Sequence, residues 1–562
     1  MSSTRFWERS YPPALRDYRL DATRLPPSLE AMAGASRDLF GTNTAFTLVL
    51  PNALTASLSF AAADAYADDF AAYLVGVLGL QPGKVVAIQL PNSLHYPVAV
   101  FGSWRAGLIV TNVNPLYTER ELRDQLRDSG AKVLVVHSAS LATAAKVARE
   151  LGIHLVVAGL WDFFSPEVGV AIRARLVGDM GPDGAAALAD HVSFESALTQ
   201  GRERGPGGLP APRQHPVALY QYTGGTTGRS KGAVLAHANI AAVLQMTGDF
   251  LDAHDAAFTP RDVMLTALPL YHVFAFVINF LMIFRQGAHN VLVPNPRPLA
   301  NLRPAFEQFP ITWMTGVDTL YAGLLAEPWF HEKPPKLKYA ISGGTALRPT
   351  TGRRWGERVC PLLEGYGMTE TSCIVSFNPP GAGARDGSVG LPMPGSDVRV
   401  VDSEGRPLAP GERGELQVRG PHVTAGYLDR PDETAQAIVD GWLRTGDVVV
   451  MDAVGWITIV DRLKDMVLVS GFNVYPNEVE AVIAAHPDVV EVAVVGVPDD
   501  ATGEAVCAYV VKRNPDLTEG ELIQFCRGQL TSYKVPKQVR FAAQLPKSPV
   551  GKILRAQLRQ AS

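Results

Sequence analysis

Residues 83–92 read GKVVAIQLPN, and this run and the segments that follow it predict the fold. A Pro-Gly turn leads into a short run dominated by Val and Ile, which is typical of a buried strand. The runs KVLVVHS (132–138) and IHLVVAGL (153–160) repeat the pattern on either side of a helical segment, LATAAKVARELG (141–152). Strands that alternate with helices predict crossover connections and a mainly parallel sheet covered on both faces. The sequence therefore predicts an α/β fold.

Two helix starts can be placed to the residue. Thr118 and Glu121 have the spacing of a capping box, in which each side chain accepts from the other residue's backbone amide, and Gly130 is a typical helix end. Thr518 and Glu521 repeat the same spacing near the C-terminus. We expect a helix after each pair.

The pattern of the chain changes twice along its length. From about 380 to 460, short Val-rich runs lie between Gly and Pro turns, which predicts a small antiparallel β subdomain. After DRLKD (461–465), strands and helices alternate over about 100 residues, enough for a separate domain. We predict a large N-terminal domain of α/β subdomains and the β subdomain over 1–463, and a small α+β C-terminal domain over 464–562. The run GRERGPGGLPAPRQH (201–215) is expected to be a loop or linker.

Composition excludes several classes of protein. The 562 residues are 47% hydrophobic, so the chain can build large cores in two to four domains of ~150 residues each. A net charge of −4 without long basic runs argues against nucleic acid as the main partner. The four cysteines form no CxxC pair, which argues against a zinc site or a disulfide framework and favours a reducing, intracellular setting. The N-terminus lacks the apolar core of a secretory signal.

Residues 263–284 run uncharged for 22 residues, long enough to span a membrane. Pro269, His272 and Asn279 weaken that interpretation. A buried strand, a turn at PLYH (269–272) and an apolar helix fit the same stretch and are favoured here. An integral membrane transporter is an alternative that rests on this stretch alone.

The stretch YTGGTTGRSKGAVLAH (222–237) is rich in Gly, Thr and Ser. It lacks the GxxxxGK[ST] pattern of a Walker A loop, because Arg229 follows Gly228 and Gly232 follows Lys231. Its chemistry still suits a phosphate cradle, since glycines let backbone amides approach phosphate oxygens. A flexible surface turn is the alternative.

Eight segments in chain order decide between these interpretations. They are the stretch at 222–237, LPLYHVFAF (268–276), ISGGTAL (341–347), EGYGMTETS (364–372), GELQVRGPHVTAGYL (414–428), WLRTGDV (442–448), DRLKDMVLVSGFNVYPNEVE (461–480) and LPKSPVGKILR (545–555). Together they resemble the motifs of the adenylate-forming superfamily, which includes acyl-CoA synthetases, luciferases and the adenylation domains of peptide synthetases. Within it, the chain most resembles bacterial long-chain fatty acid CoA ligases.

The resemblance implies a two-step reaction. A carboxylate and ATP give an acyl adenylate and pyrophosphate, and the thiol of coenzyme A then gives acyl-CoA and AMP. ATP and coenzyme A are the implied co-substrates. The first step brings two anions together and therefore implies Mg²⁺ and a positioned cation.

The resemblance also implies roles for single residues. Glu370 and Thr223 would hold the metal ion, and Lys552 would bridge the carboxylate and the α-phosphate. The remaining nucleotide contacts would come from the phosphate loop, the adenine pocket and the ribose site: Gly224, Gly225, Thr226, Thr227, Gly228, Lys231, Gly344, Thr345, Tyr366, Gly367, Thr369, Asp447 and Arg462. Tyr366 would stack on the base, and Asp447 would accept from the ribose hydroxyls.

Coenzyme A and the hinge fall in the C-terminal part. By resemblance, Lys464 lies where the family places its hinge, although many members have Asp there. The small domain would swing after adenylation and bring Ser470 and Gly471 to the thiol tunnel. Tyr533 and Lys534 would lie near the nucleotide end of coenzyme A.

The acyl pocket is expected between the helix after His272 and the segment ITWMTGVDTLY (311–321). Its lining residues are predicted to be small or apolar: Val273, Phe274, Trp313, Gly316, Val317, Gly343 and Met368. A hydrocarbon tail suits them better than an amino acid, and bulky Trp313 keeps a medium-chain as well as a long-chain acid open. His272 orders the carboxylate or satisfies a buried turn.

Alternatives remain at this point. The acid could be aryl or branched, or the enzyme could load a separate carrier protein, although no carrier domain follows Lys552. A nucleotide-binding regulator is the non-enzymatic alternative, against which the intact Glu370, Asp447, Arg462 and Lys552 argue. We expect a cytoplasmic protein; peripheral association with the inner face of a membrane and homodimer formation are compatible with this interpretation.

Overall fold

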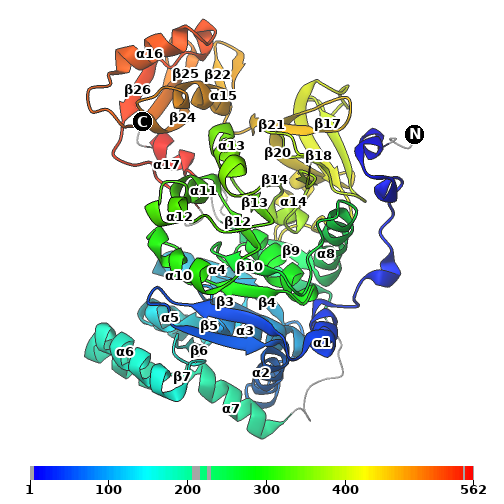
Figure 1. The fold of residues 1–562 in the computed structure, drawn as a ribbon, viewed down its shortest axis with the longest axis vertical. Helices are drawn as coiled ribbons and strands as arrows, with labels where there is room; N and C mark the ends of the chain where they lie inside the picture. Colours follow the sequence, from blue (N-terminus) through cyan, green and yellow to red (C-terminus); the bar gives the residue numbers. More distant parts are fainter. Residues whose placement is uncertain (1–4, 206–214, 224–229, 382, 549–550, 561–562) are drawn as a thin grey trace.

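The computed structural model describes residues 5–205, 215–223, 230–381, 383–548 and 551–560. Figure 1 shows two large sheets with their helices in the lower and middle part of the molecule. A smaller antiparallel sheet and the C-terminal sheet lie side by side above them. The fold class predicted from the sequence is therefore confirmed: a large N-terminal α/β part with a small β sheet, followed by a smaller mixed part.

The runs that predict the fold lie next to one another in a sheet with seven described strands. Its order is β7-β6-β5-β3-β4-β8-β9, and every neighbouring pair is parallel except β8 and β9. The strands are β3 (Val85–Gln89), β4 (Ile109–Asn112), β5 (Ala131–His137), β6 (His154–Ala158), β7 (Val192–Ser193), β8 (Val217–Thr223) and β9 (Lys231–Ala236).

The second large sheet carries a parallel centre with antiparallel edges. Its order is β16-β15-β14-β13-β12-β10-β11-β1-β2 among the described strands, parallel from β14 to β1. The strands are β1 (Thr44–Val49), β2 (Thr55–Ser59), β10 (Val263–Thr266), β11 (His289–Leu292), β12 (Trp313–Gly316), β13 (Tyr339–Ser342), β14 (Leu362–Tyr366), β15 (Ser376–Phe377) and β16 (Leu391–Pro392).

Helices pack on these sheets in two apolar clusters, a large one and a smaller one that α4 and α5 form with β3, β5 and β6. The capping box of Thr118 and Glu121 is formed, and Gly130 ends the helix in the left-handed conformation, as predicted. The helices are α1 (Leu29–Phe40), α2 (Phe60–Ala72), α3 (His95–Arg105), α4 (Glu119–Ser129), α5 (Leu141–Leu151), α6 (Pro166–Ala189), α7 (Phe194–Arg204), α8 (His237–Asp252), α10 (Arg303–Gln308), α11 (Asp318–Leu324), α12 (Pro328–Glu332), α13 (Pro349–Arg358) and α14 (Pro431–Ala437).

The loop predicted at 201–215 is wrong for its first four residues. Residues 201–204 complete α7, and the run 206–214 lies outside the described residues. Gly201 suggested a loop, but it is the point where α7 meets α2: a Cβ there would lie 1.8 Å from the carbonyl oxygen of Asp69. The glycine permits close packing of two helices rather than a turn.

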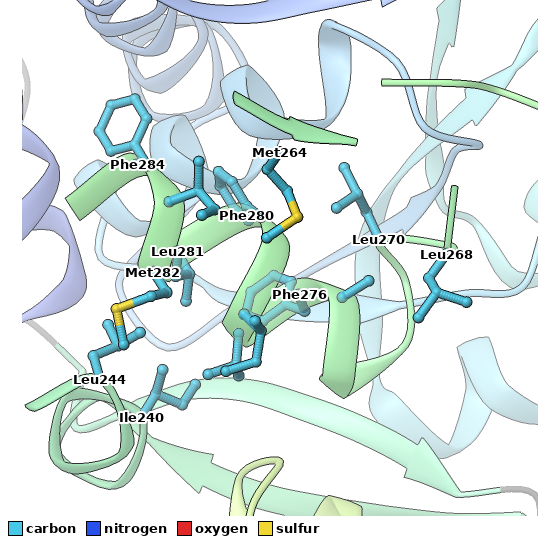
Figure 2. Packing of buried hydrophobic residues seen from close by; sticks show 14 of the residues in the cluster. Ile240, Leu244, Met264, Leu268, Leu270, Phe276, Phe280, Leu281, Met282 and Phe284 are labelled. Atoms are coloured by element: carbon cyan, nitrogen blue, oxygen red, sulfur yellow. The ribbon is translucent and has the colours of Figure 1, made fainter. Parts of the chain in front are cut away.

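The uncharged stretch at 263–284 belongs to the core. It forms β10, a turn, a π-helical segment over Ala275–Met282 and α9 (Ile283–Arg285), as the strand–turn–helix interpretation predicted. Figure 2 shows Phe276, Phe280 and Met282 of this segment among the buried side chains that include Ile240 and Leu244 of α8. Across the part of the chain that the structure describes, no helix is both long and apolar enough to cross a membrane.

The antiparallel sheet predicted from about 380 to 460 is formed by residues 397–462. Its predicted start is wrong, because Leu391–Pro392 form β16 at the edge of the second large sheet. The strands of the antiparallel sheet are β17 (Asp397–Val401), β18 (Arg413–Arg419), β19 (Ile438–Val439), β20 (Trp442–Met451) and β21 (Ile457–Arg462). Neighbouring strands are antiparallel throughout. Strand β21 leads directly to Lys464.

The C-terminal part has its own sheet and apolar clusters. Thr518 and Glu521 form the second predicted capping box, at the start of α16. The elements are β22 (Val467–Val469), β23 (Phe472–Val474), α15 (Pro476–Ala484), β24 (Val489–Asp499), β25 (Gly503–Lys512), α16 (Glu519–Arg527), β26 (Gln538–Phe541) and α17 (Arg555–Gln560). The boundary at Lys464 and the mobility of this part stay predictions.

Candidate active site

The predicted nucleotide residues gather where strands of the two large sheets end. Thr223 ends β8, Tyr366 ends β14, and Gly344 follows β13. Ligands of parallel α/β sheets bind at the carboxyl ends of the strands. Gly344 has φ +78°, which L side chains rarely adopt, and the buried hydroxyl of Thr345 has no hydrogen-bond partner among the described residues. A backbone-lined surface with a spare hydroxyl suits a planar, polar ligand.

Three predicted nucleotide residues are linked by short polar contacts. The Tyr366 hydroxyl donates to Asp447 Oδ2 at 2.6 Å, and Arg462 Nε lies 2.9 Å from Asp447 Oδ1. Asp447 and Arg462 face each other across β20 and β21, and Asp447 is 2% exposed. Burial and the Asp447 carboxylate raise the pKa of Tyr366 well above its ordinary value, so Tyr366 is a neutral donor. Sheet register therefore fixes the carboxylate that the resemblance places at the ribose.

Glu370 and Lys231 meet through a residue that the sequence reasoning did not select. The Tyr427 hydroxyl donates to Glu370 Oε1 at 2.7 Å, and Lys231 Nζ lies 5.3 Å from the centre of the Tyr427 ring. Glu370 is 7% exposed, in a short 3-10 helix over Thr369–Thr371. Tyr427 lies within the quoted family segment 414–428, so the signal was present in the sequence.

The phosphate loop is described only at its two ends. Thr223 faces Lys231 across β8 and β9, and the Ser230 hydroxyl donates to the Thr223 carbonyl oxygen. The predicted phosphate contacts Gly224, Gly225, Thr226, Thr227 and Gly228 lie outside the described residues.

The loop of Lys552 contacts the large N-terminal part of the chain. A Cβ on the preceding residue, Gly551, would lie 3.0 Å from Thr319 Oγ1 and 3.5 Å from Val317 Cγ2. Burial, together with the cations Arg462 and Lys464, lowers the pKa of Lys552 to about 8, although Asp447 and Asp465 oppose the shift. Lys552 is thus within electrostatic range of the pair formed by Asp447 and Arg462.

The turn that carries His272 is held by the side-chain amide of Asn92, which lies three residues after the end of β3. Asn92 Nδ2 donates to the carbonyl oxygens of Thr266, Leu268 and Val293, and Asn92 Oδ1 accepts from the Leu270 amide. These bonds hold the chain entering Val273 and Phe274 against the end of the second sheet. Burial lowers the pKa of His272 to about 4, so the imidazole is neutral, and its Nε2 has no partner in the described chain.

Part of the predicted acyl set lies together. A Cβ on Gly343 would lie 3.2 Å from the Phe274 ring, and the Gly343 amide donates to the Gly316 carbonyl oxygen at 3.3 Å. Val317 follows Gly316, and Val273 and Met368 are partly buried.

Trp313 is not brought to this group. It lies three residues before Gly316, and the centre of its ring is 4.4 Å from the ring centre of Phe258 and 5.0 Å from that of Tyr339. Its membership of the acyl pocket stays a prediction.

The predicted coenzyme A residues form a separate surface on the C-terminal part. Ser470 and Gly471 make the turn between β22 and β23 with φ values of +51° and +82°. The next residue, Phe472, is 57% exposed and stacks on Tyr533 with ring centres 4.9 Å apart. Lys534 pairs with Glu478 at 2.6 Å. An exposed ring stacked on a half-buried one beside a cation suits an adenine nucleotide.

The donors proposed for a metal ion are hard oxygen atoms. Glu370 supplies a carboxylate and Thr223 a hydroxyl, a type of donor that Mg²⁺ prefers when substrate phosphates complete its shell. The described residues contain no group of three or more His, Cys, Asp or Glu side chains placed to hold a metal ion by themselves. The residues present fit an ion shared with a nucleotide.

Comparison with known proteins agrees with this arrangement. The model of AMP-binding enzymes matches residues 41–428, and the model of AMP-binding enzyme C-terminal domains matches 478–552. The chain therefore belongs to the AMP-binding, adenylate-forming enzyme family.

Individual relatives are similar along most of their length. The chain is 46% identical over 500 residues to the long-chain-fatty-acid–CoA ligase of Salmonella typhimurium, covering 87% of each chain. It is 41% identical over 499 residues to the ligase of the same name from Haemophilus influenzae, covering 87% of this chain and 88% of the relative. The crystal structure of ATP-bound MatB from Rhodopseudomonas palustris superposes with a TM-score of 0.80 at 31% identity, covering 94% of this chain and 98% of that one.

Proposed function

We propose that this protein is an AMP-forming fatty acid–CoA ligase with a medium- to long-chain substrate. The observation that carries the proposal is the position of Lys552, whose loop docks beside Val317 within electrostatic range of Asp447 and Arg462. One cation would then lie between the predicted acyl and nucleotide sites. The names of the relatives at 41% to 46% identity support the substrate class.

In the first half-reaction, a carboxylate oxygen of the acid bonds to the α-phosphorus of ATP, and the bond to the bridging oxygen of pyrophosphate breaks. Lys552 would hold the carboxylate and α-phosphate oxygens together, which offsets their mutual repulsion. Asp447 would fix the ribose by accepting from its hydroxyls, with Arg462 holding the carboxylate in place. Tyr366 would lie against the base.

A bound Mg²⁺ would neutralise charge on the phosphates and pyrophosphate. Glu370 and Thr223 would hold it, and Tyr427 would fix the Glu370 carboxylate through the bond to Oε1. Lys231 would add a positive charge on the pyrophosphate side.

In the second half-reaction, the sulfur of coenzyme A bonds to the acyl carbon, the bond from that carbon to the phosphate oxygen breaks, and AMP leaves with that oxygen. We propose that the C-terminal domain, from Lys464 onward, rotates between the two steps and carries Lys552 away. Ser470 and Gly471 would then face the thiol tunnel, and Tyr533 and Lys534 the nucleotide of coenzyme A.

The acid itself would lie along Phe274, Gly343, Gly316 and Val317, with its carboxylate near His272. Each buried methylene contributes ~0.8 kcal/mol, so the depth of the pocket sets chain length. We place the protein in the cytoplasm, with fatty acid drawn from the inner face of a membrane, and propose a homodimer as its assembly.

Pyrophosphate release tests the proposal. Purified protein with ATP and Mg²⁺ is given acids from acetate to oleate, together with benzoate and a branched acid, with and without coenzyme A. We expect release that is greatest with medium- or long-chain acids and acyl-CoA formation on addition of coenzyme A. No release with any acid would refute the enzyme assignment, and adenylate that persists with coenzyme A would point to a carrier protein as acceptor.

A further inference from the structure

Arg555, three residues after Lys552, ties the Lys552 loop to helix α15. Its Nη2 lies 2.8 Å from Glu480 Oε1 and donates to Asn477 Oδ1 at 2.9 Å. Arg555 also lies 3.7 Å from Asp465, which pairs with Arg559 at 2.6 Å. These partners all follow Lys464 in the chain, so the cluster is a part of the C-terminal domain that would move as one body.

Asn477 reaches across the predicted hinge. Its Nδ2 donates to the Val460 carbonyl oxygen at 3.1 Å, and its backbone amide donates to Asp461 Oδ2 at 2.7 Å. Val460 and Asp461 belong to β21, before Lys464, whereas Asn477 lies in the first turn of α15, after it. Asp461 is 1% exposed, so its carboxylate accepts the bond from the Asn477 backbone amide away from water.

The side chain of Asn477 therefore joins two partners on opposite sides of the hinge. Its amide nitrogen holds β21, and its oxygen holds the arginine that follows Lys552. A neighbouring contact crosses the same divide: the Arg413 guanidinium of β18 lies 4.5 Å from the ring centre of Tyr475. Rotation of the C-terminal domain about Lys464 would have to break the bonds to Val460 and Asp461.

We propose that Asn477 is a positioning residue for Lys552, acting through Arg555 and holding the C-terminal domain in the orientation used for adenylation. The proposal rests on the function proposed above. It implies that Asn477 serves the first half-reaction and not the second, because its bonds to β21 are absent once the domain has rotated. A displacement of about 1 Å at a reacting group lowers a rate by as much as 10²-fold, so even a loosened Lys552 loop has a measurable effect.

Two variants separate the two bonds of the side chain. Asn477→Asp keeps an oxygen that accepts from Arg555 but cannot donate to Val460. Asn477→Ala loses both contacts. Gln524→Ala is the matched control, because Gln524 is an exposed amide side chain on α16 of the same domain.

The first readout compares the half-reactions in single turnover. We expect pyrophosphate release to slow about tenfold in Asn477→Ala and less in Asn477→Asp, in line with the loss of one or two hydrogen bonds. Thioester formation from supplied acyl adenylate and coenzyme A should stay within about twofold of the wild type in both. Equal loss in both half-reactions, or no loss in either, would overturn the proposal.

The second readout does not depend on activity. Lys464 is exposed, and we expect trypsin to cleave after it when the hinge opens. We expect both Asn477 variants to be cut there about fivefold faster than the wild type and Gln524→Ala, because opening breaks fewer bonds. Unchanged cleavage would contradict the proposal even if the variants fold and react normally. If the wild type activates no fatty acid, the proposed function fails, and cleavage alone decides whether Asn477 holds the hinge.

Discussion

The region proposed to bind the nucleotide and the Lys552 loop are built in opposite ways. On the nucleotide side, Tyr366, Asp447 and Arg462 satisfy one another through contacts of 2.6 and 2.9 Å. At the loop, burial and the cations Arg462 and Lys464 lower the pKa of Lys552 to about 8. The groups of the first region are paired with one another, whereas at Lys552 the effect of two cations on the pKa outweighs that of Asp447 and Asp465.

This difference shows how one site can serve two steps. Paired groups hold a ligand without rearranging, which is the basis of electrostatic preorganisation. A buried cation beside other cations is stabilised when an anion arrives, and it is free to leave when that anion departs. The nucleotide side would therefore act in both half-reactions and Lys552 in the first alone. Four substitutions or conditions test this contrast.

Lys552→Ala should have the largest effect. Removing a donor to the developing charge lowers the rate of such a step by ~10² to 10³. We expect that loss in pyrophosphate release, measured in single turnover, while thioester formation from supplied acyl adenylate is retained. Comparable loss in both half-reactions would erase the distinction between the two regions.

Asp447→Asn should affect both half-reactions. The substitution preserves shape but leaves Arg462 without its 2.9 Å carboxylate partner, and removing one partner of a charged hydrogen bond costs about 1–3 kcal/mol. The KM for ATP should rise about tenfold, as should the Kd for AMP measured by calorimetry, within the range that this energy allows. Arg444→Gln, an exposed arginine on the same strand that pairs with Glu415, is the control. Unchanged AMP binding would show that Asp447 has only a structural role.

The pH dependence should come next. A lysine whose pKa is lowered to about 8 loses its charge as pH rises through 8, so at pH 9 about a tenth of the free enzyme keeps the cation. The kcat/KM for ATP in the adenylation step should therefore fall by up to about tenfold between pH 7 and pH 9. Lys464→Gln removes one of the nearby cations and should move the limb to higher pH. If kcat/KM falls only near the ordinary lysine pKa in both the wild type and Lys464→Gln, the nearby cations do not lower the pKa of Lys552.

Gly343→Ala should have the smallest effect, and this effect should be confined to the use of the acid substrate. The new Cβ would lie 3.2 Å from the Phe274 ring, closer than most real contacts, so the ring must shift by a few tenths of an ångström. We expect kcat/KM for long-chain acids to fall a few-fold, less than the about tenfold change in kcat/KM that one methylene causes in a hydrophobic pocket. The KM for ATP should stay unchanged. Gly356→Ala is the control, since its Cβ would meet no atom within 4 Å. Equal loss for acetate and oleate would place Gly343 outside the acyl pocket.

The sequence was informative where local chemistry is decided by neighbours in the chain. Capping boxes at Thr118 and Thr518, the buried strands and the antiparallel sheet all follow from periodicity and turn residues, and they are formed. The family segments single out Asp447, Arg462 and Tyr366 without indicating that they contact one another. Sheet register then explains why Asp447 and Arg462 meet.

Contacts between distant segments were not predictable in the same way. Tyr427 reaches Glu370 from 57 residues away, and Asn477 reaches Arg555 from 78 residues away. Both residues lie inside the quoted family segments, but nothing in the local pattern of either one indicates its distant partner. Gly201 is an error of the opposite kind, because its local pattern predicts a loop. In the structure it lies where two helices approach each other closely.

Isotope transfer tests the central claim most directly. A fatty acid labelled with ¹⁸O in its carboxylate is converted with ATP and coenzyme A, and the AMP product is examined by mass spectrometry. If the carboxylate attacks the α-phosphorus and coenzyme A then displaces AMP, one ¹⁸O atom appears in the phosphate of AMP and one stays in the acyl-CoA. Unlabelled AMP, or ADP in its place, would contradict an acyl adenylate as the intermediate and with it the roles assigned to Lys552 and Asp447.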